Sequence, residues 1–272
     1  VINDNVISPD DSTFFTTSGM QKHKSKFTDS ETPNTLTDIQ RCLRLNDLDE
    51  IGDGTHYLDF HMLGLFSFNK MTLQEAVDFW MQFCHYINVI PDTVTIHPDK
   101  QEWISLYSKY DVNVTLDPEC VWSDGSIGGY CTEFYKDGVE IGNIVNTLDK
   151  HIDCGFGMER LESFYTGQPI ISKEEILERT IEVLLHSDVQ PSSLGRGYIL
   201  RKLIRMGVNH EIQFIEHPVI EKEIKRIERI RNSVPRWVSK NPNKDEKFFW
   251  ETYGITKDEI LEIYPLFFGK EG

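Results

Sequence analysis

The 272-residue sequence lacks the common nucleotide and metal signatures. No phosphate loop ending in Gly-Lys-Ser/Thr is present, because Gly269-Lys270 is followed by Glu271. A dinucleotide fingerprint would need a third glycine where Arg160 stands, and neither an HExxH pattern nor a Cys/His cluster with zinc spacing occurs. These absences argue against a P-loop, a dinucleotide fold and a zinc hydrolase, and they predict no structural zinc.

Membrane and disulfide signals are also missing. No apolar run approaches the length of a membrane span, and the first residues, VINDNVISPDD, are too polar for a signal peptide. The five cysteines include no CxxC pair, which is typical of reduced thiols in an intracellular compartment. The sequence therefore predicts a cytoplasmic protein without a membrane partner, and leaves an organellar or viral origin open.

Charge is distributed unevenly along the chain. Residues 1–172 account for the whole net charge of −16, while residues 173–272 hold 17 basic and 17 acidic residues. Residues 196–240 contain 11 basic and 5 acidic residues. This balance fits a polyanionic partner contacted over a limited surface, although a solvated charged helix would look the same.

The hydrophobic pattern divides the chain in two. Residues 1–172 alternate strand-like runs (12–17, 59–68, 92–97 and a hairpin at Asp137-Gly138) with helices at 72–87 and 158–165. After the capping box at Ser172, helices alone are predicted, at 197–208, 219–231 and 257–263. We expect an α+β fold with domains at 1–172 and 173–272, the second small and all-helical.

The stretch IDCGFGMER, residues 152–160, has its own physical logic. Asp153 ends a predicted strand, Gly155 and Gly157 let backbone lie flat against a ligand, and Arg160 projects a guanidinium from the next helix. Tight strand–helix packing with Arg160 in a surface ion pair would explain the same residues. The stretch alone does not choose between a ligand site and packing.

Ten blocks of the sequence, one of them within this stretch, resemble alanyl-tRNA synthetases of class II. They occur in the family's order at residues 16–24, 40–44, 46–48, 60–64, 66–68, 132–133, 140–143, 153–160, 196–201 and 253–254. The resemblance implies an antiparallel class II catalytic sheet flanked by helices, followed by a helical tRNA-recognition domain. The implied activity is ATP-dependent activation of alanine and its transfer to tRNA-Ala.

The resemblance also assigns roles to residues. Arg44 and Arg160 match the two catalytic arginines that grip the phosphates of ATP, and Met62, Gly155 and Gly157 complete the ATP site. Glu133 matches an acidic position near the phosphates that would help to hold Mg²⁺. The implied alanine pocket consists of Trp122, Asn143 and Asp153, with Asp153 pairing with the substrate ammonium.

The basic segment resembles the family's contact with the tRNA acceptor stem. The implied tRNA-binding residues are Ser193, Arg196, Arg201, Lys202 and Arg205. A few phosphate contacts suffice for such a surface on an otherwise acidic protein.

Several departures from the family pattern leave alternatives open. The motif 2 loop after Arg44 is short, His61 stands where the family has glutamate, and Ser193 and Gly195 replace asparagines. We expect no editing domain, no long motif 1 helix and a monomer. The alternatives are an aminoacyl-activating paralogue that loads a non-tRNA acceptor, and a non-catalytic synthetase-like RNA-binding protein.

Overall fold

The computed structural model describes residues 2–9, 13–29, 32–123 and 125–268. The chain forms two compact units, Val1–Asp188 and Val189–Gly272. Helix α4 (Lys173–His186) therefore belongs to the first unit, whereas the sequence pattern placed it after a boundary at residue 172. Within the described ranges, no helix is both long and apolar enough to cross a membrane.

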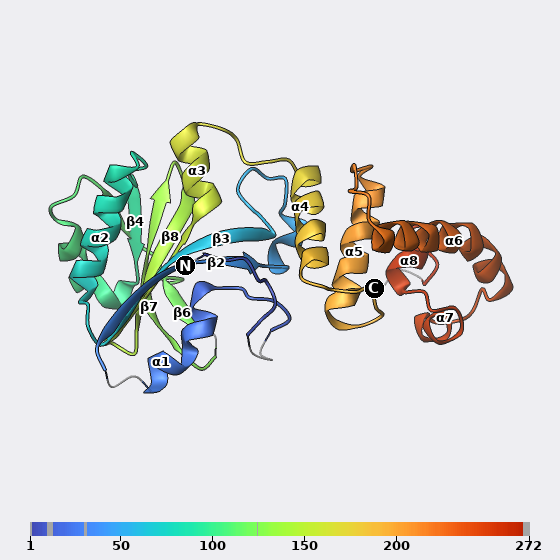
Figure 1. The fold of residues 1–272 in the computed structure, drawn as a ribbon, viewed down its shortest axis with the longest axis horizontal. Coiled ribbons are helices and arrows are strands. Elements are labelled where there is room, and N and C mark those ends of the chain that lie inside the picture. The colour runs from blue at the N-terminus through green and yellow to red at the C-terminus, as the bar shows by residue number, and fades with distance from the viewer. Residues whose placement is uncertain (1, 10–12, 30–31, 124, 269–272) are drawn as a thin grey trace. The chain divides into compact units, whose positions relative to one another are not determined.

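A mixed, mostly antiparallel sheet of nine strands forms the first unit (Figure 1). Its strand order is β1-β2-β3-β9-β8-β7-β4-β5, with β6 paired to β7, and only β1–β2 and β4–β5 are parallel. The strands are β1 Ile2–Asn3, β2 Asn34–Leu43, β3 Asp59–Phe68, β4 Thr93–Ile96, β5 Asn113–Leu116, β6 Val121–Ser123, β7 Gly128–Lys136, β8 Val139–Thr147 and β9 His151–Gly157. This is the α+β architecture expected from the sequence.

The hairpin at Asp137-Gly138 is confirmed. Both residues have positive φ, 49° and 79°, which is the backbone that a tight two-residue turn between β7 and β8 requires. Two other expectations were wrong. Residues 13–17 form only a single bridge, Ile7 to Phe15, with isolated backbone hydrogen bonds that join Thr16 to Val6 and to Leu43 at the end of β2; residue 12 lies outside the described ranges. Strand β9 continues through both glycines to Gly157, so they belong to the sheet rather than to a loop.

Helices α2 (Leu73–Tyr86) and α3 (Met158–Thr166) and the 3₁₀ helix η3 (Pro98–Tyr107) pack against the main core on one side of the sheet. Helix α1 (Lys24–Asp29) and the 3₁₀ helix η1 (Gly19–His23) pack against Phe66 and Phe68 of β3 on the other side, and the 3₁₀ helix η2 (Asn46–Asp49) follows β2. A capping box at Thr72 starts α2, whose Trp80 stacks on Phe156 of β9 at 3.8 Å between ring centroids. Alternate residues of β9 thus face this core, which leaves the others for the opposite face.

The second unit is helical within its described residues. Its helices are α5 Gly195–Asn209, α6 Pro218–Lys240, α7 Glu246–Tyr253 and α8 Lys257–Leu261. A core of Ile230, Val234, Val238, Phe249, Ile255 and Ile260 holds the last three together. Helix α6 runs past Pro235, beyond the predicted end at 231, and α7 was not foreseen because its apolar residues are clustered aromatics.

Candidate functional site

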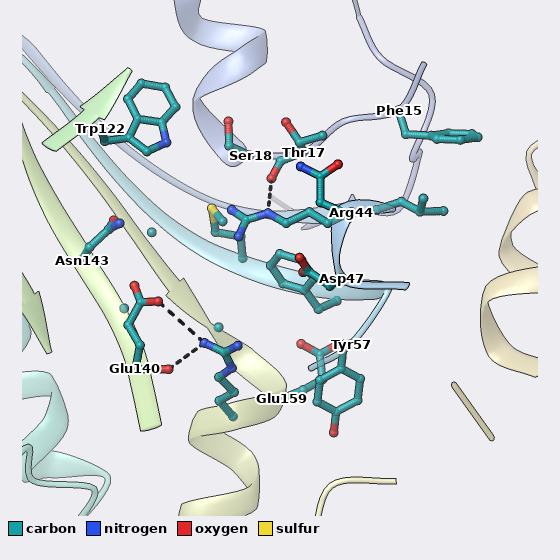
Figure 2. Close-up of a pocket in the computed structure, with 18 of the residues that line it drawn as sticks. Phe15, Thr17, Ser18, Arg44, Asp47, Tyr57, Trp122, Glu140, Asn143 and Glu159 are labelled. Carbon is teal, nitrogen blue, oxygen red and sulfur yellow. Dashed lines mark hydrogen bonds and ion pairs between the residues drawn. The ribbon is translucent and has the colours of Figure 1, made fainter. Parts of the chain in front are cut away.

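A cavity of about 830 Å³ opens on the first unit, on the face of the sheet away from α2. Its lining includes nine residues from distant parts of the sequence, of which Figure 2 labels Arg44, Trp122 and Asn143. These are the nine that the sequence assigned to ATP and alanine: Arg44, Met62, Trp122, Glu133, Asn143, Asp153, Gly155, Gly157 and Arg160. The structure thus brings every predicted catalytic-domain site residue to one place.

Strand register explains this convergence. In β9, Asp153 and Gly155 lie on the cavity face, while Cys154 and Phe156 between and beyond them are buried in the core. Asn143 of β8 lies opposite Gly155, and Glu133 of β7 lies opposite Asn143. Side chains from three adjacent strands therefore project into the same cavity.

Arg44 follows the last residue of β2 and is held from one side only. Its Nε donates to the carbonyl of Thr17 at 3.0 Å, and its guanidinium carbon lies 5.1 Å from the centre of the Phe60 ring. Within the described part of the chain, Arg44 has no acidic ion-pair partner. Its terminal nitrogens are thus available to an anion in the cavity (Figure 2).

Arg160 extends from the first turn of α3 into the other side of the cavity. Its Nε donates to the carbonyl of Thr55 at 3.1 Å and its Nη1 to the carbonyl of Glu140 at 2.8 Å. The Glu140 carboxylate is 3.9 Å from Nη1, so the ion pair that sequence reasoning left open does form, but inside the cavity lining (Figure 2). Backbone carbonyls fix this guanidinium in direction.

Glu140 has a perturbed acidity. Burial and the nearby charge of Glu133 raise the pKa of the Glu140 carboxyl, against the opposing charges of Arg160 and Arg44. The carboxylates of Glu133 and Glu140 and the guanidinium groups of Arg44 and Arg160 therefore interact within one cavity. An added phosphate or metal ion would change the electrostatic interactions among these charged groups.

The remaining predicted pocket residues differ in how tightly they are held. Asp153 is only 8% exposed, and Trp122 of β6 packs against the core residues beneath the cavity wall. Glu133 accepts hydrogen bonds from Tyr135 at 2.8 Å and Thr95 at 3.3 Å. A buried carboxylate beside an amide and an indole can receive a small ammonium compound.

The two glycines of β9 differ in the space that a side chain would have at each position. A Cβ on Gly155 would lie 2.8 Å from Sδ of Met62, which is closer than real contacts allow. A Cβ on Gly157 would meet only the Arg160 side chain, at ordinary distances from 3.7 Å. Packing therefore demands the first glycine, while the second keeps the cavity floor free of a side chain.

The sequence missed an ion-pair network behind Arg160. Glu159 accepts hydrogen bonds from the backbone N of His61 at 2.8 Å and from Nη2 of Arg179 at 2.7 Å, and its Oε1 is 3.0 Å from Nδ1 of His61. Arg179 also donates to Asp59 at 2.9 Å. The sequence spacing gave no signal, because 98 to 120 residues separate most of these partners.

The network shifts two pKa values. Burial alone would raise the pKa of Glu159, but hydrogen bonds from His61 and Arg179 lower it below its usual value. The hydrogen bond with Glu159 raises the pKa of His61 in spite of burial. His61 is absent from the cavity lining, so its difference from the family pattern acts on the cavity through Glu159, which does line it.

The five predicted tRNA-binding residues lie in the second unit, at and within α5. Ser193 precedes the helix and is exposed, and Arg196 and Lys202 are half-buried. Arg201 lies 3.1 Å from the buried carboxylate of Glu223, and Arg205 lies 3.7 Å from that of Glu259. Two of the four cations among these residues, Arg201 and Arg205, are thus paired within their own unit.

Comparison with known proteins places the fold and its relatives. Residues 2–117 match the family model of class II (A) tRNA synthetases. The chain is 27% identical to the alanine–tRNA ligase of Desulfitobacterium hafniense, over 80% of this chain and 34% of the relative. The corresponding enzymes of Chlamydia caviae and Tropheryma whipplei are also 27% identical, over 74% and 75% of this chain.

The chain spans about a third of the length of the curated relatives it matches. The similarity therefore covers a part of those proteins.

Proposed function

We propose that this relative of the class II alanine–tRNA ligases activates alanine with ATP and transfers the alanyl group to the 3′ end of tRNA-Ala. The main support for this proposal is that two arginines and three pocket residues line one cavity: Arg44, Arg160, Trp122, Asn143 and Asp153. The cavity offers cations for phosphates and an anion for an ammonium group. Activation of an amino acid by ATP requires both kinds of contact.

In the proposed first step, the alanine carboxylate attacks the α-phosphorus of ATP and pyrophosphate leaves. Negative charge grows on phosphate oxygens, and the guanidinium groups of Arg44 and Arg160 offset it from fixed positions. Mg²⁺ bound with ATP would neutralise further phosphate charge, and Glu133 is its predicted ligand. Gly155 and Gly157 leave room for the nucleotide above Met62.

Alanine would bind with its ammonium at Asp153 and its methyl group against Trp122. A wall of this kind excludes larger side chains by steric clash. It discriminates weakly against glycine, because one methyl group contributes only ~1–3 kcal/mol.

ATP–pyrophosphate exchange tests the activation step directly. We expect exchange that depends on alanine and falls by roughly 10²- to 10³-fold in Arg44→Ala. Exchange that does not depend on alanine would refute the assignment of the amino acid. Binding of ATP without any exchange would favour the non-catalytic alternative.

One observation favours a second candidate for the acceptor. Because Arg201 and Arg205 are paired with Glu223 and Glu259, the basic face of α5 offers an RNA fewer cations than the sequence suggested. An enzyme that loads alanine onto a carrier protein or small molecule would need no such face. Charging of an acceptor-stem minihelix, with and without its G·U pair, separates the two: stable alanyl-RNA supports the tRNA ligase.

A further inference from the structure

We propose that Cys120, Cys131 and Glu133 form a binding site for a borderline-soft divalent cation of the zinc class. The two Sγ atoms and a carboxylate oxygen all lie within 4.8 Å of one another. The site shares Glu133 with the cavity lining, and the inference does not depend on the proposed synthetase activity.

Strand pairing builds the site. Val121 of β6 lies opposite Tyr130 of β7, which places Cys120 opposite Cys131, and the backbone N of Cys131 donates to the carbonyl of Cys120 at 2.9 Å. Glu133 follows two residues later on the same face of β7. Sequence spacing hid this arrangement, because eleven positions separate the cysteines and no zinc motif has that form.

The charges around the three donors favour a cation. Both thiols are fully buried, and the Glu133 carboxylate is half-buried beside them, with the Cys131 Sγ 3.7 Å from Oε1. Across the described ranges, no lysine or arginine forms an ion pair with Glu133, and its polar partners are the hydroxyls of Tyr135 and Thr95. Two potential thiolates and a carboxylate without a basic partner match the donors of a metal site.

The donor set selects the class of ion. Mg²⁺ takes oxygen ligands and ordinarily keeps several waters, whereas two thiolates with one carboxylate suit Zn²⁺ or Cd²⁺. The Thr95 hydroxyl, which accepts from the Cys120 Sγ at 2.9 Å, or a water would supply a fourth ligand. An ion held here takes Glu133 away from ATP-bound magnesium, because the other oxygen is bonded to Tyr135 and Thr95.

The site also ties together two parts of the cavity wall. Trp122 lies two residues after Cys120, and Glu133 lies two residues after Cys131; both line the cavity. A metal bridge would fix the short strand β6 against β7. It would thereby hold Trp122 in place.

Titration of the chelator-treated, reduced full chain with Cd²⁺ tests the site. We expect a thiolate-to-cadmium charge-transfer band in the ultraviolet that saturates at one ion per chain and survives excess Mg²⁺. Cys120→Ser and Cys131→Ser should each abolish the stoichiometric band, and Glu133→Gln should weaken binding about tenfold or more. Cys84→Ser is the matched control, since Cys84 is equally buried but outside the cluster, and it should leave the band unchanged.

A second measurement covers variants that fail to fold. All five cysteines are buried, so the readout is the change that Zn²⁺ causes: it should slow the alkylation of Cys120 and Cys131 alone relative to the metal-free wild-type chain, as identified by mass spectrometry. No band in the wild type, or a band that persists in the Cys120→Ser/Cys131→Ser double variant, would overturn the proposal. Protection of a different pair of cysteines would do so as well.

Discussion

Arg179 of α4 donates to Glu159 at 2.7 Å, so a helix outside the cavity fixes the residue that precedes Arg160. The same guanidinium donates to Asp59 at the start of β3 at 2.9 Å. One side chain thus joins the beginning of α3 to the sheet. Arg160 extends from the same first turn of α3 that this joint holds.

Replacing Arg179 should weaken both stability and ATP use. Arg179→Ala leaves the buried carboxylates of Asp59 and Glu159 short of a partner, which costs about 2 kcal/mol, less than a fully buried pair would because the Arg179 side chain is 29% exposed. Denaturant unfolding measures this loss, and the KM for ATP in pyrophosphate exchange should rise. Arg179→Lys should recover part of the stability through its charge, but not the two-sided hydrogen bonding. An unchanged KM for ATP in Arg179→Ala would show that Arg160 is positioned without it.

Asp153→Asn should separate amino-acid binding from nucleotide binding. An amide cannot neutralise an ammonium group, so the KM for alanine should rise roughly 10- to 100-fold, the equivalent of ~1.5–3 kcal/mol. The affinity for ATP, measured by calorimetry without alanine, should hardly change. An equal loss of both affinities would contradict the assignment of Asp153.

Gly155→Ala and Gly157→Ala should differ in kind. The first forces a Cβ against Met62 and should lower the free energy of unfolding by about 1–3 kcal/mol. The second should fold with nearly wild-type stability while binding ATP more weakly, because its methyl group stands on the cavity floor. Thermal melts with and without ATP measure both effects; a destabilised Gly157→Ala would show that packing needs that glycine too.

His61 should contribute to the pH dependence of the free energy of unfolding. Its pKa is raised in the folded state, so its contribution is fully present below the unfolded value near 6.5 and is lost as pH rises through the folded value. The lowered pKa of Glu159 acts at the acid end, where its contribution is lost as pH falls through the folded value. We therefore expect His61→Gln to flatten the decline in unfolding free energy above about pH 6.5. Parallel wild-type and His61→Gln curves in that range would contradict this account.

Two neighbouring cations of α5 should behave differently when removed. Arg201→Ala removes one of the two arginine partners of the buried Glu223, leaving Arg226, and should destabilise the second unit. Lys202, which has no ion pair among the described residues, should be removable without loss of stability. If α5 contacts an acceptor stem, Lys202→Ala should reduce the salt dependence of RNA binding by about one unit of slope. Filter binding across a salt series measures it, and an unchanged slope would argue against a phosphate contact at Lys202.

The sequence by itself determined the local elements and the identity of the cavity residues. Capping boxes at Thr72 and Ser172 and the Asp137-Gly138 turn depend on adjacent residues, so pattern reasoning found them. The blocks around Arg44, Asn143 and Asp153 pointed to one site because each carries its own motif.

Only the tertiary structure decided which side chains meet across the sheet. Strand register placed Cys120 opposite Cys131, and helix packing brought Arg179 to Glu159 and α4 into the first unit. Helix packing also paired Arg201 with the buried Glu223, whereas the sequence had assigned this arginine to a tRNA-binding surface. Contacts of this kind depend on strand pairing and helix packing between distant segments, and a linear pattern does not encode them.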